Sequence, residues 1–153
     1  MNIRPVRQDD AEGICAVLKE LTAAGKRTRP SDLDFVRANY VDHPDKIDCF
    51  VAEDDDGTIL GFQSLRLATE GNEFGTPVGW AMAGTHISPR AARKGIGAKL
   101  FAATKVVALQ AGVPAIEAYI GASNEEGLAY YEAMGFRTYR EPEGAICKSY
   151  AVG

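Results

Sequence analysis

The chain has 153 residues and a formal net charge of −4, and its composition is that of an ordinary globular protein. A chain of this length buries roughly two thirds of its unfolded surface, so we expect one domain, residues 1–153. The acidic balance argues against nucleic acid as a partner. The lack of an apolar signal segment, or of any run of 18 apolar residues, predicts a cytoplasmic protein with no membrane partner.

Hydrophobic periodicity and turn residues divide the chain into alternating strands and helices. The expected elements of the first half are an edge strand at 2–7, a helix capped by Asp9 or Asp10 and ending near Gly25, a helix capped by Ser31 and ending before Pro44, hairpin strands at 47–53 and 59–68, and a strand at 78–88. Those of the second half are a helix opened by Gly95 and ended by 112–114, a strand at 115–120, a helix capped by Ser123 or Asn124 and ending at Gly135, and strands at 136–140 and 145–152. This order predicts a mixed α/β fold whose first half is mostly antiparallel.

The three cysteines, Cys15, Cys49 and Cys147, are odd in number and far apart. No C-x-x-C pair exists, so the sequence supports neither a zinc site nor a disulfide framework. We expect reduced thiols packed as small apolar side chains, and no metal site.

A glycine turn between the strand at 78–88 and the following helix is the most informative segment. It reads Arg93-Lys94-Gly95-Ile96-Gly97-Ala98, and the helix begins within it. The first amide groups of a helix have no partner inside the helix, and the helix dipole adds partial positive charge there. Such a start binds phosphate, and glycine lets the phosphate approach the backbone because it has no Cβ.

Charge around this turn favours an anionic ligand. From Phe74 to Ile116 the chain has no aspartate or glutamate, although it has five basic residues there. A helix start ordinarily favours acidic residues, so their absence runs against helix stability. A solvated basic helix face next to a structural turn is the alternative explanation of the same pattern.

Two other phosphate motifs fit less well. No Walker sequence G-x-x-x-x-G-K-[ST] is present. A dinucleotide fingerprint requires a third glycine where Leu100 stands, although Glu117 does follow Gly97 by 20 residues. A nucleotide-binding protein therefore stays a minor alternative.

The turn resembles the pyrophosphate motif of the GNAT superfamily of acyl-CoA N-acyltransferases, [Q/R]-x-x-G-x-[G/A]. The match begins at Ala92, which departs from the glutamine or arginine of the motif. Downstream, Asn124 to Phe136 is similar to the family pattern N-x-x-A-x-x-x-Y-x-x-x-G-F. The resemblance covers about residues 78–140, and the later part also looks like the branch that acylates amino acids and phosphinothricin.

The resemblance implies acetyl-CoA as the acyl donor and a direct transfer to the primary amine of a small molecule. It implies a central, mostly antiparallel sheet flanked by helices and splayed between the strands at 78–88 and 115–120, where the acyl-CoA arm enters. The expected cofactor-binding residues are Ile87, which pairs with the arm, Asn124, which bonds the arm or caps its helix, and the turn residues Arg93, Lys94, Gly95, Ile96, Gly97 and Ala98. A homodimer is compatible with this fold.

The resemblance also implies the catalytic groups. Tyr131 is the expected general acid, since a phenol can protonate the similarly basic CoA thiolate, and Tyr130 is expected to pack or line the site. The strand at 78–88 has no carboxylate, so His86 is the candidate base, with Glu117 or an ordered water as alternatives.

The acceptor is expected to lie against the first two helices. Lys26, Arg27 and Arg29 in the loop between them are candidates for holding a substrate carboxylate, although a solvated basic loop is the simpler explanation. The nearby Asp32 and Asp34 leave a polyamine acceptor open. The departure at Ala92 and the missing carboxylate base leave a second hypothesis, an acyl-CoA-binding regulatory module with weak catalysis.

Overall fold

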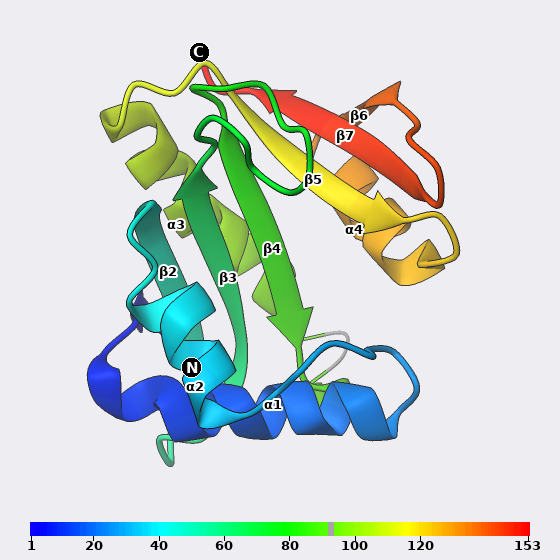
Figure 1. Cartoon of the computed structure of the whole chain (residues 1–153). Helices are drawn as coiled ribbons and strands as arrows, with labels where there is room; N and C mark the ends of the chain where they lie inside the picture. Colours follow the sequence, from blue (N-terminus) through cyan, green and yellow to red (C-terminus); the bar gives the residue numbers. More distant parts are fainter. Residues whose placement is uncertain (92–93) are drawn as a thin grey trace.

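One open sheet organises the chain in the computed structural model, which describes residues 1–91 and 94–153. Within these residues seven strands follow the order β1-β2-β3-β4-β5-β7-β6, and only the β4–β5 pair is parallel (Figure 1). The strands are β1 Asn2–Pro5, β2 Lys46–Glu53, β3 Ile59–Leu67, β4 Ala81–Ile87, β5 Ala115–Gly121, β6 Arg137–Arg140 and β7 Ala145–Ala151. The predicted mixed fold with a mostly antiparallel sheet is confirmed.

Helices cover both faces of this sheet. The α-helices are α1 Ala11–Ala23, α2 Leu33–Val36, α3 Ile96–Gln110 and α4 Glu125–Ala133; α2 continues as a π-helix at Arg37–Val41, and 3-10 turns lie at Gln8–Asp10 and Pro89–Ala91. A core cluster that includes Phe62 joins the sheet to α1 and α2. Two further clusters, which include Phe101 and Leu100, lie between the sheet and α3 or α4.

Local sequence chemistry explains most element boundaries. Pro5 ends the edge strand β1, as expected of a residue without an amide donor. Asp32, not Ser31, caps α2 and accepts a hydrogen bond from the amide of Phe35 at 3.2 Å. The strand β4 begins at Ala81 instead of residue 78, because Gly79 has a φ of 90° and forms a turn before it.

The sheet opens between β4 and β5. Their ladder has only two pairs, Ala81 with Ile116 and Met82 with Glu117. Beyond these pairs the strands diverge, and Figure 1 shows the ends of β4 and β5 pointing toward α1 and α4 respectively. The predicted splay is present, and it exposes one edge of β4 to the gap.

Candidate functional site

Two cavities meet where the sheet opens. The larger, about 980 Å³, lies between the α1–α2 loop, the far half of β4 and the end of β5. The smaller, about 760 Å³, lies at the start of α3. Ile87, Lys26 and Tyr130 line both cavities, so one continuous surface runs from the start of α3 into the open sheet.

The smaller cavity contains most of the residues expected to bind the cofactor. Ile87, Gly95, Ile96, Gly97 and Ala98 all line it. The side chain of Ile96 is buried in the core, so its backbone is the part available to a ligand. Lys94 is exposed next to the cavity-lining Gly95, whereas Arg93 lies outside the described residues.

The two glycines of the turn are required for different reasons. Gly95 is the N-cap of α3 with a φ of 72°, a left-handed conformation that favours glycine. Gly97 is buried in the first helical turn, and a Cβ there would overlap the ring of Tyr130. The close approach at Gly97 is therefore made by a tyrosine of α4, a packing constraint that the motif alone did not indicate.

Tyr131 reaches the open sheet from α4. Its side chain is 6% exposed and lines the larger cavity. The hydroxyl of Tyr131 lies 2.7 Å from Oγ1 of Thr85 on β4, and burial raises the pKa of the phenol. The hydroxyl is thus protonated at neutral pH and placed at the exposed edge of β4.

His86 is on the opposite face of β4, where its ring stacks on Phe62 with centroids 4.8 Å apart. Burial, and then the charges of Arg27 and Arg29, lower the pKa of His86 to about 3. Nη1 of Arg27 lies 3.2 Å from Nε2 of His86. A guanidinium only donates, so the neutral ring accepts this bond through the lone pair that a base would use.

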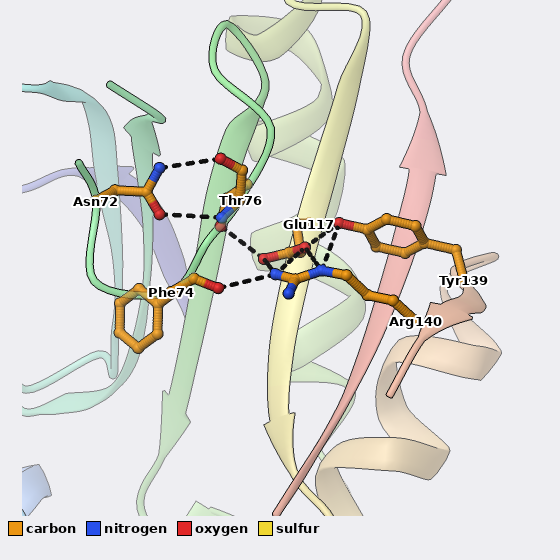
Figure 2. Close-up of polar contacts among 6 residues, drawn as sticks. All are labelled: Asn72, Phe74, Thr76, Glu117, Tyr139 and Arg140. Atoms are coloured by element: carbon orange, nitrogen blue, oxygen red, sulfur yellow. Dashed lines mark hydrogen bonds and ion pairs between the residues drawn. The ribbon is translucent and has the colours of Figure 1, made fainter. Parts of the chain in front are cut away.

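Glu117, the alternative base, is 1% exposed and fully engaged (Figure 2). Its carboxylate accepts hydrogen bonds from Oγ1 of Thr76 at 2.6 Å, from the hydroxyl of Tyr139 and from the guanidinium of Arg140, the closest at 2.9 Å. Arg140 also donates to the carbonyl of Phe74 at 2.9 Å. This cluster joins the β3–β4 loop to β5 and β6, and it occupies the carboxylate of Glu117, which lines the larger cavity, with three donor side chains.

Asn124 caps α4, which is one of the two roles expected for it from the sequence. Its side-chain oxygen accepts a hydrogen bond from the amide of Gly127 at 3.0 Å. The residue also lines the larger cavity, so the cap places its amide group beside the site. The two roles are compatible.

The α1–α2 loop supplies three cations to the mouth of the larger cavity. Lys26 pairs with Glu126 at 2.7 Å, and Arg29 lies 4.0 Å from Glu73. The guanidinium of Arg27 is held by His86 and by the carbonyl of Pro30, and it lies over the ring of Phe35. Whereas Lys26 and Arg29 each lie near a carboxylate, the contacts of Arg27 in the described structure are all with neutral groups.

The described residues form neither a metal-binding cluster nor a membrane-spanning helix. In the described ranges 1–91 and 94–153, no three His, Cys, Asp or Glu side chains gather where they could hold a metal ion. No helix in those ranges combines the length and apolarity needed to traverse a bilayer. The three cysteines are free and buried, as predicted.

Comparison with known proteins places the chain in a family. The sequence profile of the acetyltransferase (GNAT) family matches residues 14–136. The chain belongs to this family. No curated protein matches it by sequence.

Solved GNAT structures share the whole fold. A GCN5-related N-acetyltransferase from Kribbella flavida has a TM-score of 0.81 at 20% identity, covering 98% of this chain and 96% of that one. A crystal structure assigned as a phosphinothricin N-acetyltransferase has a TM-score of 0.78 at 19% identity, covering 99% and 98%. The PaiA N-acetyltransferase from Thermoplasma acidophilum, in complex with coenzyme A, has a TM-score of 0.75 at 19% identity, covering 98% of each chain.

The predicted GNAT resemblance and acetyltransferase class are thus confirmed. Gln63 and Thr85 also contact the tyrosines of this GNAT site, and sequence reasoning missed both. The available signal for Gln63 was a polar residue in the otherwise apolar run of β3. No pattern distinguished Thr85.

His86→Gln is expected to leave the pH dependence of turnover between pH 6 and 9 unchanged. Because the pKa of His86 is lowered to about 3, the ring loses its proton far below pH 6 and is neutral throughout this range. The measurement is kcat/KM from pH 6 to 9 for both proteins. Loss in the variant of an ionisation near pH 6 to 7 would show that His86 is the base after all.

Proposed function

We propose that this GNAT protein transfers the acetyl group of acetyl-CoA to the primary amine of a small molecule. The observation that carries the proposal is the junction of the two cavities. There the start of α3, the free edge of β4 and the hydroxyl of Tyr131 border one continuous surface. A phosphate site, an edge for an extended chain and an acid are thus arranged in the order that an acyl-CoA needs.

The start of α3 would hold the pyrophosphate. The amide of Lys99 donates to the carbonyl of Gly95 at 3.2 Å, and the amides before it in the first turn have no acceptor inside the helix, which makes them candidates to bind a phosphate. The edge of β4 from Ala83 to Ile87 has no ladder partner on the β5 side, and an extended arm can pair with it. These two features support acetyl-CoA as the donor.

In the reaction, the neutral amine nitrogen attacks the thioester carbonyl and forms a C–N bond. The C–S bond then breaks, and the sulfur leaves as a thiolate. Tyr131 would give its phenolic proton to that sulfur, and the nitrogen, which is positively charged after the attack, would lose one proton to water. The products are then an amide and CoA thiol. Holding both reactants at the open sheet supplies a large share of the rate enhancement.

Proton removal from the ammonium form of the acceptor would occur through water. His86 uses its basic lone pair to accept from Arg27, and the oxygens of Glu117 are occupied by Thr76, Tyr139 and Arg140. Neither candidate base from the sequence is free. A water chain in the larger cavity fits these contacts better than a dedicated side chain.

The acceptor side of the cavity favours an amine that also carries an anionic group. Arg27 is half-buried at the cavity wall, and its recorded partners, His86, Pro30 and Phe35, are all neutral. A carboxylate on the acceptor would supply the missing opposite charge. The test compares the kcat/KM values of two amines that differ only in a carboxylate. We expect a higher value for the amine with the carboxylate, and we expect this difference to disappear in an Arg27→Gln variant.

Ala98→Glu is the variant that tests the donor site. Ala98 is exposed in the first turn of α3 and lines the smaller cavity. A glutamate there is favourable for the helix but repels a pyrophosphate. In calorimetric titration with acetyl-CoA, we expect wild type to bind and Ala98→Glu to bind at least about tenfold more weakly.

Two controls accompany this titration. Ala98→Gln adds the same bulk without charge, and Ala102→Glu adds the same charge one turn further along the exposed face of α3. Both are expected to bind acetyl-CoA almost as wild type does. Failure of wild type to bind, or equal binding by Ala98→Glu, would remove the acyl-CoA site from the start of α3.

A further inference from the structure

A chain of hydrogen bonds connects the first turn of α3 to Tyr131. The hydroxyl of Tyr130 donates to the carbonyl of Gly97 at 2.8 Å. Nε2 of Gln63 lies 2.9 Å from that hydroxyl and 2.8 Å from Oγ1 of Thr85. Oγ1 of Thr85 in turn lies 2.7 Å from the hydroxyl of Tyr131. Four side chains from two strands and α4 thus form one path.

The carbonyl of Gly97 determines the direction of the three bonds made by Tyr130 and Gln63, whereas either oxygen can donate in the bond between Thr85 and Tyr131. A carbonyl can only accept, so Tyr130 uses its single proton on Gly97. The oxygen of Tyr130 can then only accept from Gln63, which must present its NH2 group. The second N–H of that group donates to Thr85.

Thr85 therefore has its own proton left to donate. Its nearest recorded partner for that proton is the oxygen of Tyr131, at 2.7 Å. When Thr85 donates to this oxygen, the proton of Tyr131 is free of the network. Because Tyr131 lines the larger cavity, its proton can point toward the gap between β4 and β5.

This arrangement of hydrogen bonds leaves one buried polar atom of Gln63 without a partner in the described residues. Gln63 is fully buried, and its Oε1 has no hydrogen-bond partner among residues 1–91 and 94–153. An unpaired buried acceptor is unfavourable and uncommon in native proteins. The side-chain oxygen of Gln63 thus stays unpaired, while its NH2 group bonds Tyr130 and Thr85, and Thr85 bonds Tyr131.

We propose that Thr85, oriented by Gln63, is a positioning residue that holds the proton of Tyr131 toward the departing sulfur. The proposal rests on the acid role of Tyr131 in the proposed function. When the Tyr131 O–H bond breaks and the S–H bond forms, the phenolate oxygen keeps the hydrogen bond from Thr85. Water then returns a proton to Tyr131, and the path regains its original state.

The path also connects catalysis to the donor site. Gly97 belongs to the helix start that would hold the pyrophosphate, and the ring of Tyr130 packs directly on it. The same carbonyl that sets the direction of the path is thus fixed next to the cofactor. Tyr130 differs in function from Tyr131: it transmits the orientation and donates no proton to the substrate.

The test is a double-mutant cycle between Thr85 and Tyr131. Thr85→Val keeps the shape and removes the hydroxyl, and we expect kcat to fall by about tenfold with an unchanged Kd for acetyl-CoA. Thr85→Ser restores the hydroxyl and is expected to recover most of kcat. In a Tyr131→Phe background, Thr85→Val is expected to have no further effect, because its partner is gone.

Each outcome of the cycle has a distinct meaning. An equal loss from Thr85→Val in both backgrounds would overturn the positioning role and leave the acid role of Tyr131 intact. An unchanged kcat in Tyr131→Phe alone would overturn the acid role and, with it, this proposal. Gln63→Met provides a second route to the same coupling if Thr85→Val does not fold, and it is expected to lower kcat only when Tyr131 is present.

Discussion

Tyr131→Phe is expected to lower kcat by about a hundredfold or more and to leave the affinity for acetyl-CoA almost unchanged. The phenylalanine keeps the ring in the core, where Tyr131 packs edge-on against Phe136 with centroids 5.0 Å apart. The variant loses the hydroxyl, which is the proposed proton donor to the sulfur and the partner of Thr85. The thiolate must then leave unprotonated or take its proton from water.

Steady-state kinetics and calorimetry together check this prediction. The matched control is Tyr119→Phe, because Tyr119 also lines the larger cavity but is 41% exposed and lies against Phe74. We expect the control to stay within about twofold of the wild-type kcat, since it makes no contact with the hydroxyl path. A Tyr131→Phe enzyme as fast as the control would exclude Tyr131 as the acid.

The glycine turn shows what a local pattern can predict. Gly95 and Gly97 predicted the start of α3 correctly, because the glycines and the apolar spacing that follows them are local features of the sequence. The reason for Gly97 is not local. It depends on Tyr130, which lies 33 residues further along the chain and approaches only after α4 packs on the sheet.

The catalytic surroundings show the same limit. Tyr131 and the splay were predicted through a motif and an element order. The hydrogen-bond path through Gln63 and Thr85 depends on the register of β3 against β4, which pairs these two residues directly. The surroundings of His86, the candidate base, could not be predicted for a similar reason, because its burial and its contact with Arg27 are tertiary properties.

Glu117→Gln is expected to lower the free energy of unfolding by about 3 kcal/mol, because removing one partner of a buried ion pair leaves the other uncompensated. The side chains of Glu117 and Arg140 are 1% and 29% exposed, so little solvent is available to replace the lost charge. The glutamine would also place an NH2 group where the guanidinium of Arg140 and the hydroxyl of Tyr139 now donate. Urea unfolding of both proteins measures the difference through the midpoint and slope.

The matched control is Glu126→Gln, whose partner Lys26 lies at 2.7 Å but on the surface, with side chains 76% and 43% exposed. Exposed pairs contribute little, so we expect no measurable change in stability.

The same two variants separate a structural role of Glu117 from a catalytic one. The cluster fixes Phe74 and Thr76 at the wall of the larger cavity, so loosening it should raise the KM for the acceptor more than it lowers kcat. A Glu117→Gln protein as stable as wild type but without turnover would instead identify Glu117 as the base, and the water route for the proton would have to be abandoned.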